Sequence, residues 1–261
     1  MLLHIASDVC FPGSCLSCGT LLTTKCNDIV LDDIEGDFFC HKCSMQLKKI
    51  DKCCCKRCGY PLKKENFLDK KINYCVNCEK FKYYFNISRS CYEYKGIIRK
   101  ILLHFKFYFS TDALSFIGLS LYLKYKNELN KADVVCFVPI TRTKLFLKGF
   151  NHAGLITNMF MKYAKNEKCD IVLLNDLFVK LKKTQQSKKL SQFERLHKHH
   201  FFGINKKYLV DKYFTLNGKN ILIIDDIMTT GSTLNELSFL IGNKYPKANI
   251  ECLTFARTML Y

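Results

Sequence analysis

The apolar positions of this chain change their spacing along its length, and after residue 80 they predict a series of strands and helices. A loosely alternating stretch at residues 84–94 predicts a strand that Gly96 ends. Apolar residues then recur at helical spacing from Ile97 to Phe105, and a second helix is expected at residues 113–130. The hydrophobic pattern therefore opens this part of the chain with a strand and two helices.

Beyond residue 130, short apolar runs alternate with amphipathic stretches. The runs predict strands at residues 134–138, 171–174, 221–224 and 250–255, and the amphipathic stretches predict helices at 152–164 and 233–243. This alternation indicates an α/β fold, with a mostly parallel sheet covered by helices on both faces. Residues 180–200 are polar and basic with no clear period, so we expect a long loop that acts as a lid.

The cysteines divide the chain into two parts. Twelve of the 16 cysteines lie between Cys10 and Cys78, and the later ones are scattered singly. We therefore expect two units: a small cysteine-rich zinc-ribbon module at residues 1–80 and an α/β domain at residues 81–261.

Four C-x2-C pairs stand out in the first part. They are Cys15/Cys18, Cys40/Cys43, Cys55/Cys58 and Cys75/Cys78. Two such pairs supply four thiolates to one tetrahedral zinc ion, and a closed site of this kind is structural. The spacing predicts one zinc for the first two pairs and a second zinc for the last two, while a cross-braced pairing of the first with the third stays open. Cys53 and Cys54 crowd the third pair as possible competing ligands.

Charge and targeting signals add a partner class and a compartment. The net charge of +18 favours a polyanionic partner, although lysine enrichment in an AT-rich genome would explain it equally well. The first residues lack the basic start and long apolar stretch of a secretory signal, and no apolar stretch is long enough to cross a membrane. We therefore expect a cytoplasmic protein, in which reduced cysteines favour metal binding over disulfides.

The most informative stretch lies at residues 221–233, where an apolar strand runs into Asp225 and Asp226. A loop rich in threonine, glycine and serine follows and opens a helix. Backbone amides at a helix N-terminus attract an anion, and adjacent carboxylates suit vicinal hydroxyls or a magnesium ion. The GxxxxGK element of P-loop ATPases is missing, which excludes that class.

This stretch resembles the 5-phosphoribosyl-1-diphosphate (PRPP) binding motif of type I phosphoribosyltransferases, and the whole chain resembles the ComF family of competence-associated proteins. The matching motifs are Cys15–Gly19, Cys55–Gly59, Tyr94-x-Gly96, Lys106-Phe107, Val138-Pro139-Ile140, Arg142, Gly149-Phe150-Asn151, Thr184, Gln186, Arg195 and Ala256-Arg257. The sequence departs from the family pattern at Lys148, His152 and Lys198, which puts the side of the second substrate in doubt.

The resemblance implies roles for individual residues. Asp225 and Asp226 would hold the ribose hydroxyls and magnesium, and the 5-phosphate would bind Thr229, Thr230, Gly231, Ser232 and Thr233. Arg142, with Lys148, would face the pyrophosphate. Lys182, Lys183 and Arg195 of the lid would neutralise the leaving pyrophosphate, or they form only a solvated basic loop. Asp225, Asp226, Arg142 and Arg195 are thus the candidate catalytic residues.

Three functions remain open from the sequence. The chain is a PRPP-binding factor that handles single-stranded DNA during uptake, an active phosphoribosyltransferase on an unknown amine or base, or a zinc-ribbon scaffold for other uptake proteins. The motif favours PRPP or ribose 5-phosphate as ligand under the first two, and it leaves enzymatic turnover undecided.

Overall fold

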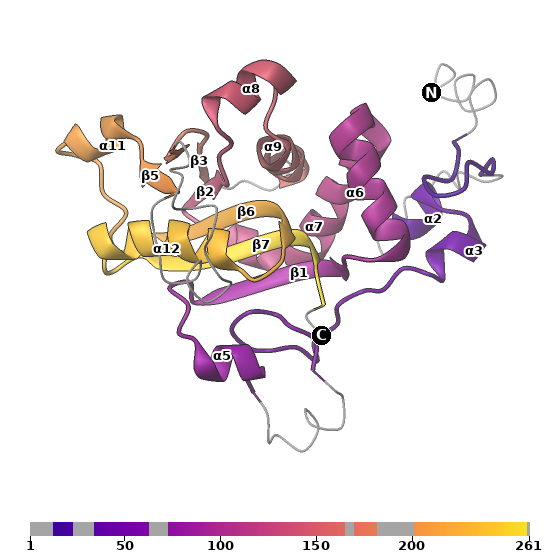
Figure 1. The fold of residues 1–261 in the computed structure, drawn as a ribbon, viewed down its shortest axis with the longest axis horizontal. Helices are drawn as coiled ribbons and strands as arrows, with labels where there is room; N and C mark the ends of the chain where they lie inside the picture. The colour runs from indigo at the N-terminus through magenta and orange to yellow at the C-terminus, as the bar shows by residue number, and fades with distance from the viewer. Residues whose placement is uncertain (1–12, 23–33, 63–72, 165–169, 182–200, 260–261) are drawn as a thin grey trace.

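The structure of the protein, a computed structural model, describes residues 13–22, 34–62, 73–164, 170–181 and 201–259 (Figure 1). Its centre is a five-stranded sheet in which every neighbouring pair of strands is parallel. In spatial order the strands are β1 (Ile87–Glu93), β7 (Asn249–Arg257), β6 (Asn220–Met228), β2 (Val134–Phe137) and β3 (Val172–Leu174). The predicted parallel α/β sheet is confirmed, and each of its strands overlaps a stretch that the apolar pattern marked.

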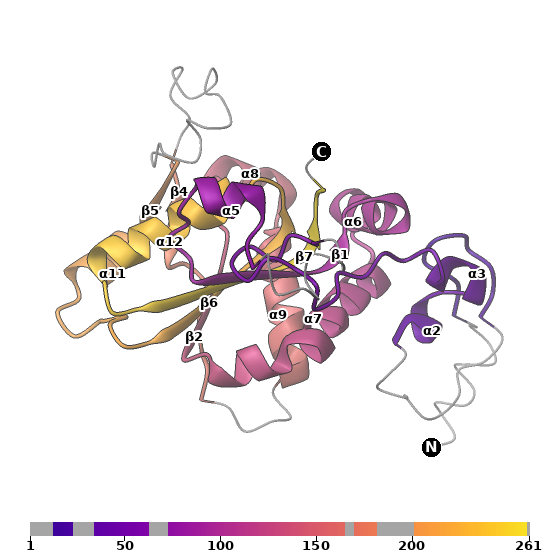
Figure 2. The same cartoon turned by 90° about the horizontal axis from the view of Figure 1, so that it is seen from below.

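Helices cover both faces of this sheet, because successive strand residues point to opposite sides. Val135, Leu222 and Ile224 face one apolar cluster, and their neighbours Val134, Ile221 and Ile223 face the other. The first cluster is closed by α6 (Gly96–Tyr108), α7 (Thr111–Lys131) and α9 (His152–Ala164), and the second by α12 (Ser232–Lys244). Figure 2 shows α7 and α9 on one side of the sheet and α12 on the other.

The remaining elements are short. They are α2 (Ile34–Phe38), α3 (His41–Ser44), α5 (Val76–Lys80), α8 (Arg142–Lys148), α11 (Lys206–Val210), β4 (Phe178–Lys180) and β5 (Phe202–Ile204). Strands β4 and β5 form a separate antiparallel pair, and beyond it the backbone amide of Leu181 donates to the carbonyl of Phe201 at 2.8 Å. The expected lid therefore begins and ends at this hairpin, and its residues 182–200 lie outside the described part of the chain.

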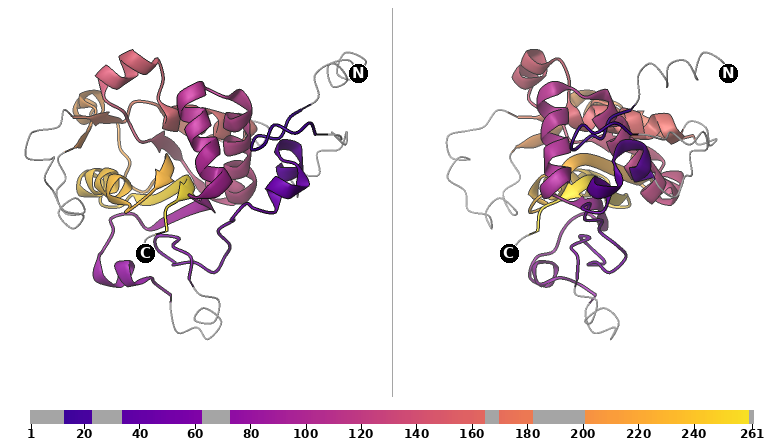
Figure 3. Two further views of the ribbon diagram at one scale, coloured as in Figure 1. Left: turned by 45° about the vertical axis from the view of Figure 1, so that its right-hand side comes forward. Right: turned by 90° about the vertical axis from the view of Figure 1, so that its right-hand side faces the viewer.

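The cysteine-rich segments pack directly on the α/β core. Cys15 and Cys43 belong to the same apolar cluster as Phe116 of α7, whereas Cys55, Cys58 and Cys75 belong to the cluster on the other face. Figure 3 accordingly shows the indigo segment beside the magenta helices. The division near residue 80 remains a prediction about folding units, and the described residues share their two cores across it. No helix among the described residues is long and apolar enough to cross a membrane.

Candidate functional site

The two predicted acidic residues lie within the central strand β6 and not in the loop after it. Strand β6 continues past Ile224 because β7 pairs with it as far as Met228, with Asp225 opposite Thr254 and Met228 opposite Arg257. The expected strand end at Ile224 is therefore corrected by four residues. The sheet ladder holds the backbone of both carboxylates near the carboxyl end of the parallel strands, where open α/β sheets bind ligands.

The predicted phosphate loop joins β6 to the N-terminus of the 13-residue helix α12. Thr229 is exposed, and the Thr230 hydroxyl accepts from the Ser232 amide at 3.3 Å and bonds the Ser232 hydroxyl at 3.1 Å. Ser232 and Thr233 form the first turn of the helix, so their backbone amides belong to its positive end. The arrangement suits a phosphate group bound by backbone amides and small hydroxyls.

Gly231 cannot be replaced by another residue without moving the loop. Its φ of +80° lies in the left-handed region that favours glycine. A Cβ atom there would lie 2.6 Å from Met228 Cε and 3.3 Å from Tyr83 Cε1. The Tyr83 hydroxyl also donates to the carbonyl of Thr230 at 3.0 Å. Met228 and Tyr83 thus form the floor on which the loop rests.

The acid pair has an electrostatic partner that the sequence did not assign. Lys106, near the end of α6, places its Nζ 2.6 Å from Asp226 Oδ2. The Asp226 amide donates to Asp225 Oδ1 at 2.9 Å. Burial, followed by the adjacent charge of Asp226, raises the pKa of Asp225 to about 8, and Lys106 and Lys180 oppose that rise. Lys106 belongs to the Lys-Phe motif, but only the fold brings it to this site.

The Gly-Phe-Asn turn at residues 149–151 and the following His152 contact the backbone of two segments near the acid pair. Asn151 Nδ2 donates to the carbonyl of Val138 at 2.9 Å, and His152 Nε2 lies 3.2 Å from the carbonyl of Lys106. His152 is buried, and this burial lowers the pKa of its imidazole. His152, one of the residues that depart from the family pattern, therefore contacts the backbone of Lys106. The side chain of Lys106 in turn supplies the cation at the acid pair.

Of the basic residues expected to face the pyrophosphate, the structure describes the position of some and not of others. Arg142 is the first residue of α8, a helix that the apolar pattern did not predict, and its side chain is exposed. Within the described ranges no ion pair joins Arg142 to the acid pair. Arg195, Lys182 and Lys183 lie outside the described residues. At the end of that segment, Glu236 of α12 accepts from the amides of Phe201 and Phe202 at 2.6 and 2.9 Å.

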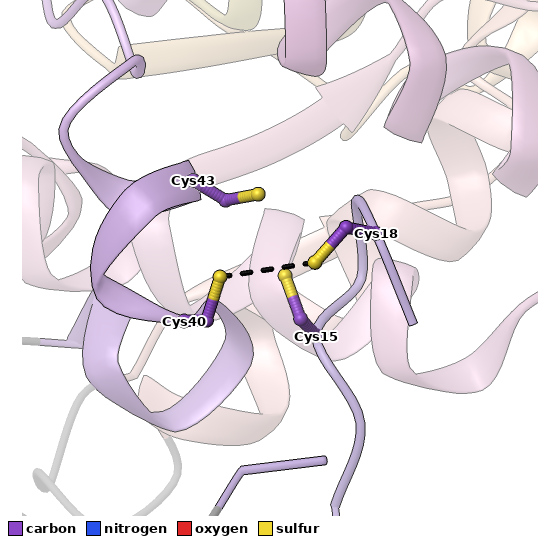
Figure 4. A group of neighbouring side chains, drawn as sticks. All are labelled: Cys15, Cys18, Cys40 and Cys43. Atoms are coloured by element: carbon purple, nitrogen blue, oxygen red, sulfur yellow. Dashed lines mark hydrogen bonds between the residues drawn. The ribbon is translucent and has the colours of Figure 1, made fainter. Parts of the chain in front are cut away.

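The first thiol group, which we call the N-terminal tetrad, consists of Cys15, Cys18, Cys40 and Cys43. Its sulfur atoms all lie within 4.8 Å of one another and point toward a common centre (Figure 4). Cys18 Sγ lies 3.7 Å from Cys40 Sγ. A hydrogen bond with Thr20 lowers the pKa of Cys18 to about 6, which favours the thiolate that a metal needs. This grouping corresponds to the predicted one, and four thiolates at this spacing suit zinc.

The second thiol group, the edge tetrad, consists of Cys55, Cys58, Cys75 and Cys78, again within 4.8 Å. It covers the edge strand β1, whose Ser88 amide donates to the carbonyl of Arg57 at 2.6 Å. A Cβ at Gly59 would lie 2.7 Å from the Ser88 carbonyl oxygen, so glycine allows this close packing. Cys53 and Cys54 are not part of the group. The cross-braced pairing is not the one that the structure assembles.

Comparisons with known proteins agree with this architecture. Residues 179–259 match the model of the phosphoribosyl transferase domain. The chain is 24% identical over 226 residues to competence protein ComFC of Bacillus subtilis, covering 84% of each protein. It is 24% identical over 219 residues to competence protein F of Haemophilus influenzae, covering 80% of this chain and 86% of that protein.

Among solved structures, a hypoxanthine phosphoribosyltransferase from Staphylococcus aureus aligns with a TM-score of 0.31 and 16% identity, over 54% of this chain and 61% of that one. The resemblance that the motifs predicted is confirmed: the chain is similar to two competence proteins over about four fifths of its length, and its residues 179–259 match the phosphoribosyl transferase domain.

Proposed function

We propose that the loop after β6 binds the 5-phosphate of PRPP or ribose 5-phosphate, and that Asp225 and Asp226 bind the ribose hydroxyls with magnesium. One observation carries this proposal. A half-buried acid pair on a central parallel strand leads directly into a glycine-dependent loop at the N-terminus of α12, inside the matched domain. Magnesium, when bound, would neutralise part of the pyrophosphate charge, and carboxylate oxygens are ligands that it prefers.

The remaining groups of the site fit the same ligand. Thr229, Thr230, Ser232 and Thr233 supply hydroxyls or amides to the phosphate, and Gly231 shapes the loop. Arg142 and Lys148 lie on the exposed helix α8 and would attract the pyrophosphate, with Arg195 joining them from the lid. We further propose one structural zinc ion in each tetrad, because eight thiolates in two closed groups leave no open coordination position.

We propose that the cellular role is the handling of single-stranded DNA during uptake, in the cytoplasm. The net charge of +18 and the competence proteins that the chain resembles support this role. Among the described residues, α8 presents Arg142, Lys144 and Lys148 to solvent without an acidic residue, and Phe146 beside them is 89% exposed. Cations that alternate with an exposed aromatic ring suit a single strand. Other proteins of the uptake machinery are further candidate partners.

Ligand binding is tested by thermal unfolding with PRPP and magnesium. At about a hundred times its dissociation constant, a ligand adds roughly 2.7 kcal/mol to the free energy of unfolding. Asp226→Asn should remove most of the shift, because it removes a charge that faces the ribose or its metal. Asp170→Asn is the matched control, since Asp170 is exposed and outside the site. An equal shift in Asp226→Asn would place the ligand elsewhere.

Turnover separates this role from the second candidate, a phosphoribosyltransferase that acts on an amine or base. In that reaction Asp225, Asp226, Arg142 and Arg195 would be the catalytic residues. Labelled PRPP is incubated with candidate acceptors, with and without single-stranded DNA. Pyrophosphate release that depends on an acceptor supports the enzyme. Binding without release supports a ligand-regulated DNA-handling protein, and absence of binding leaves the zinc-ribbon scaffold.

A further inference from the structure

Arg257, the last residue of β7, is a cation enclosed between the edge tetrad and the phosphate loop. Its side chain is 1% exposed. Nη1 donates to the carbonyl of Cys58 at 2.5 Å, and Nη2 lies 3.5 Å from Cys58 Sγ. The guanidinium also stands over the ring of Tyr60, 5.4 Å from its centroid. Both terminal nitrogens of the guanidinium therefore contact Cys58 of the edge tetrad.

The charge of this arginine needs a counter-charge. A buried guanidinium without an anionic partner is strongly destabilising. Among the described residues no carboxylate lies within ion-pair distance of Arg257, and its Nε has no hydrogen-bond partner. Four thiolates around one divalent ion carry a net charge of about −2. The edge tetrad in its metal-bound form is thus the anion that Arg257 faces, with Cys58 as the contact.

The same Nη1 of Arg257 also contacts the floor of the phosphate loop. Nη1 lies 2.9 Å from Met228 Sδ, and the Ser88 hydroxyl donates to the same sulfur at 3.1 Å. The methyl group of Met228 is the atom nearest to the missing Cβ of Gly231. Contacts therefore lead from Cys58 Sγ through Arg257 and Met228 to the loop at Gly231. Arg257 and Met228 pair with each other at the ends of β7 and β6.

A second contact follows the same route. Tyr83, a few residues after the ligands Cys75 and Cys78, donates its hydroxyl to the carbonyl of Thr230 and stacks on Phe85 with centroids 4.7 Å apart. In the described part of the chain, the N-terminal tetrad instead packs in the cluster on the opposite face of the sheet from Met228 and Tyr83.

From these contacts we infer that Arg257 is a positioning residue that couples metal binding at the edge tetrad to the shape of the phosphate loop. It acts as the counter-ion of the metal-bound thiolates and holds Met228 beneath Gly231. The link to the ligand rests on the proposed PRPP site, whereas the link to the metal does not.

The metal half is tested by zinc release to a chromogenic chelator, which should proceed in two phases from the two tetrads of the full chain. Arg257→Met should accelerate one phase by about tenfold or more, as expected when a partner of a metal ligand is lost, and leave the other unchanged. Arg99→Met, an exposed arginine on α6, should leave both phases unchanged. If Arg257→Met fails to fold, Arg257→Lys replaces it. Lysine keeps the charge but cannot reach both Cys58 atoms, so a smaller acceleration is expected.

The ligand half uses the same variants with excess zinc and measures the dissociation constant of PRPP with magnesium by calorimetry. Arg257→Met should weaken PRPP binding by about tenfold while Arg99→Met does not. Unchanged zinc release in the folded arginine variant overturns the inference, as does altered release with unchanged PRPP affinity. If the unmodified protein binds no PRPP, the proposed function fails, and the release phases still decide whether Arg257 stabilises the metal site.

Discussion

Lys106 Nζ lies 2.6 Å from Asp226 Oδ2, so helix α6 supplies the cation that balances the second carboxylate of β6. Lys106→Met should raise the pKa of Asp225 further, because Lys106 opposes that rise in the intact protein. We expect PRPP–magnesium binding at pH 7 to weaken by roughly three- to tenfold. Lys100→Met, exposed on the same helix, is the control. Equal affinities measured by calorimetry for the two variants would contradict a role for Lys106.

The pKa of about 8 at Asp225 makes ligand binding dependent on pH. At pH 7 the carboxyl of the free protein carries a proton, which a divalent cation must displace. Apparent affinity for PRPP with magnesium should therefore rise with pH by up to about tenfold per unit below pH 8. Calorimetry in buffers of different ionisation enthalpy should show that a proton is released. A flat affinity between pH 6 and 8 would show that Asp225 is already ionised.

The raised pKa of Asp225 also predicts how the stability of the ligand-free protein changes with pH. The folded state holds this proton more tightly than the unfolded chain does. The contribution of Asp225 to the free energy of unfolding is therefore complete below its ordinary pKa of 3.8 and is lost as pH rises toward 8. Asp225→Asn should be more stable than the unmodified protein at pH 8, and the advantage should disappear near pH 4. Urea unfolding at both pH values measures the difference.

Elemental analysis should give two zinc ions per chain, and well under one would exclude the assignment of the tetrads. Cys15→Ser should retain one zinc ion and lose several kcal/mol of stability, because the free energy of metal binding adds to folding. The loss should extend into α7, since Cys15 shares a core cluster with Phe116. Cys53→Ser is the control, because Cys53 lies outside both tetrads and should leave both ions bound.

Single-stranded DNA binding has a quantitative dependence on salt. Each neutralised phosphate should lower log K by roughly 0.7 per decade of salt, so about four to six contacts give a slope of about −3 to −4. Removing Lys144 and Lys148 of α8 together should reduce that slope by somewhat more than one unit. Removing Lys182 and Lys183 of the expected lid together should reduce the slope by a similar amount. Removing Lys126 and Lys131 at the end of α7 is the control, and no binding at low salt would contradict the DNA role.

Much of the fold follows from the sequence because both faces of the sheet are buried. The apolar runs of β2, β6 and β7 and the amphipathic pattern of α9 record that burial directly. Helix α8 was missed because its apolar residues Leu145, Phe146 and Leu147 are contiguous and exposed, which gives no helical period. Strands β4 and β5 were missed because three residues carry too little pattern.

The candidate site also has parts that the sequence predicts and parts that it does not. The acid pair, the loop and both cysteine groupings were visible because each is a local spacing in the sequence. The contacts of Lys106 with Asp226 and of Arg257 with Cys58 join residues far apart in the chain, so only the strand order brings them together. Their motifs were visible in the sequence, but the physical reason for them was not.

The hairpin of β4 and β5 fixes both ends of the segment at residues 182–200. Its closing bond joins Leu181 to Phe201, and Glu236 ties β5 to α12. Since the ends stay together whatever lies between them, doubling the length of the segment costs only about 0.6 kcal/mol. Relatives can therefore exchange, lengthen or shorten this segment without moving β6 or α12. The residues that would face the proposed ligand from this segment could therefore vary among relatives, while the strand and helix that would hold that ligand stay unchanged.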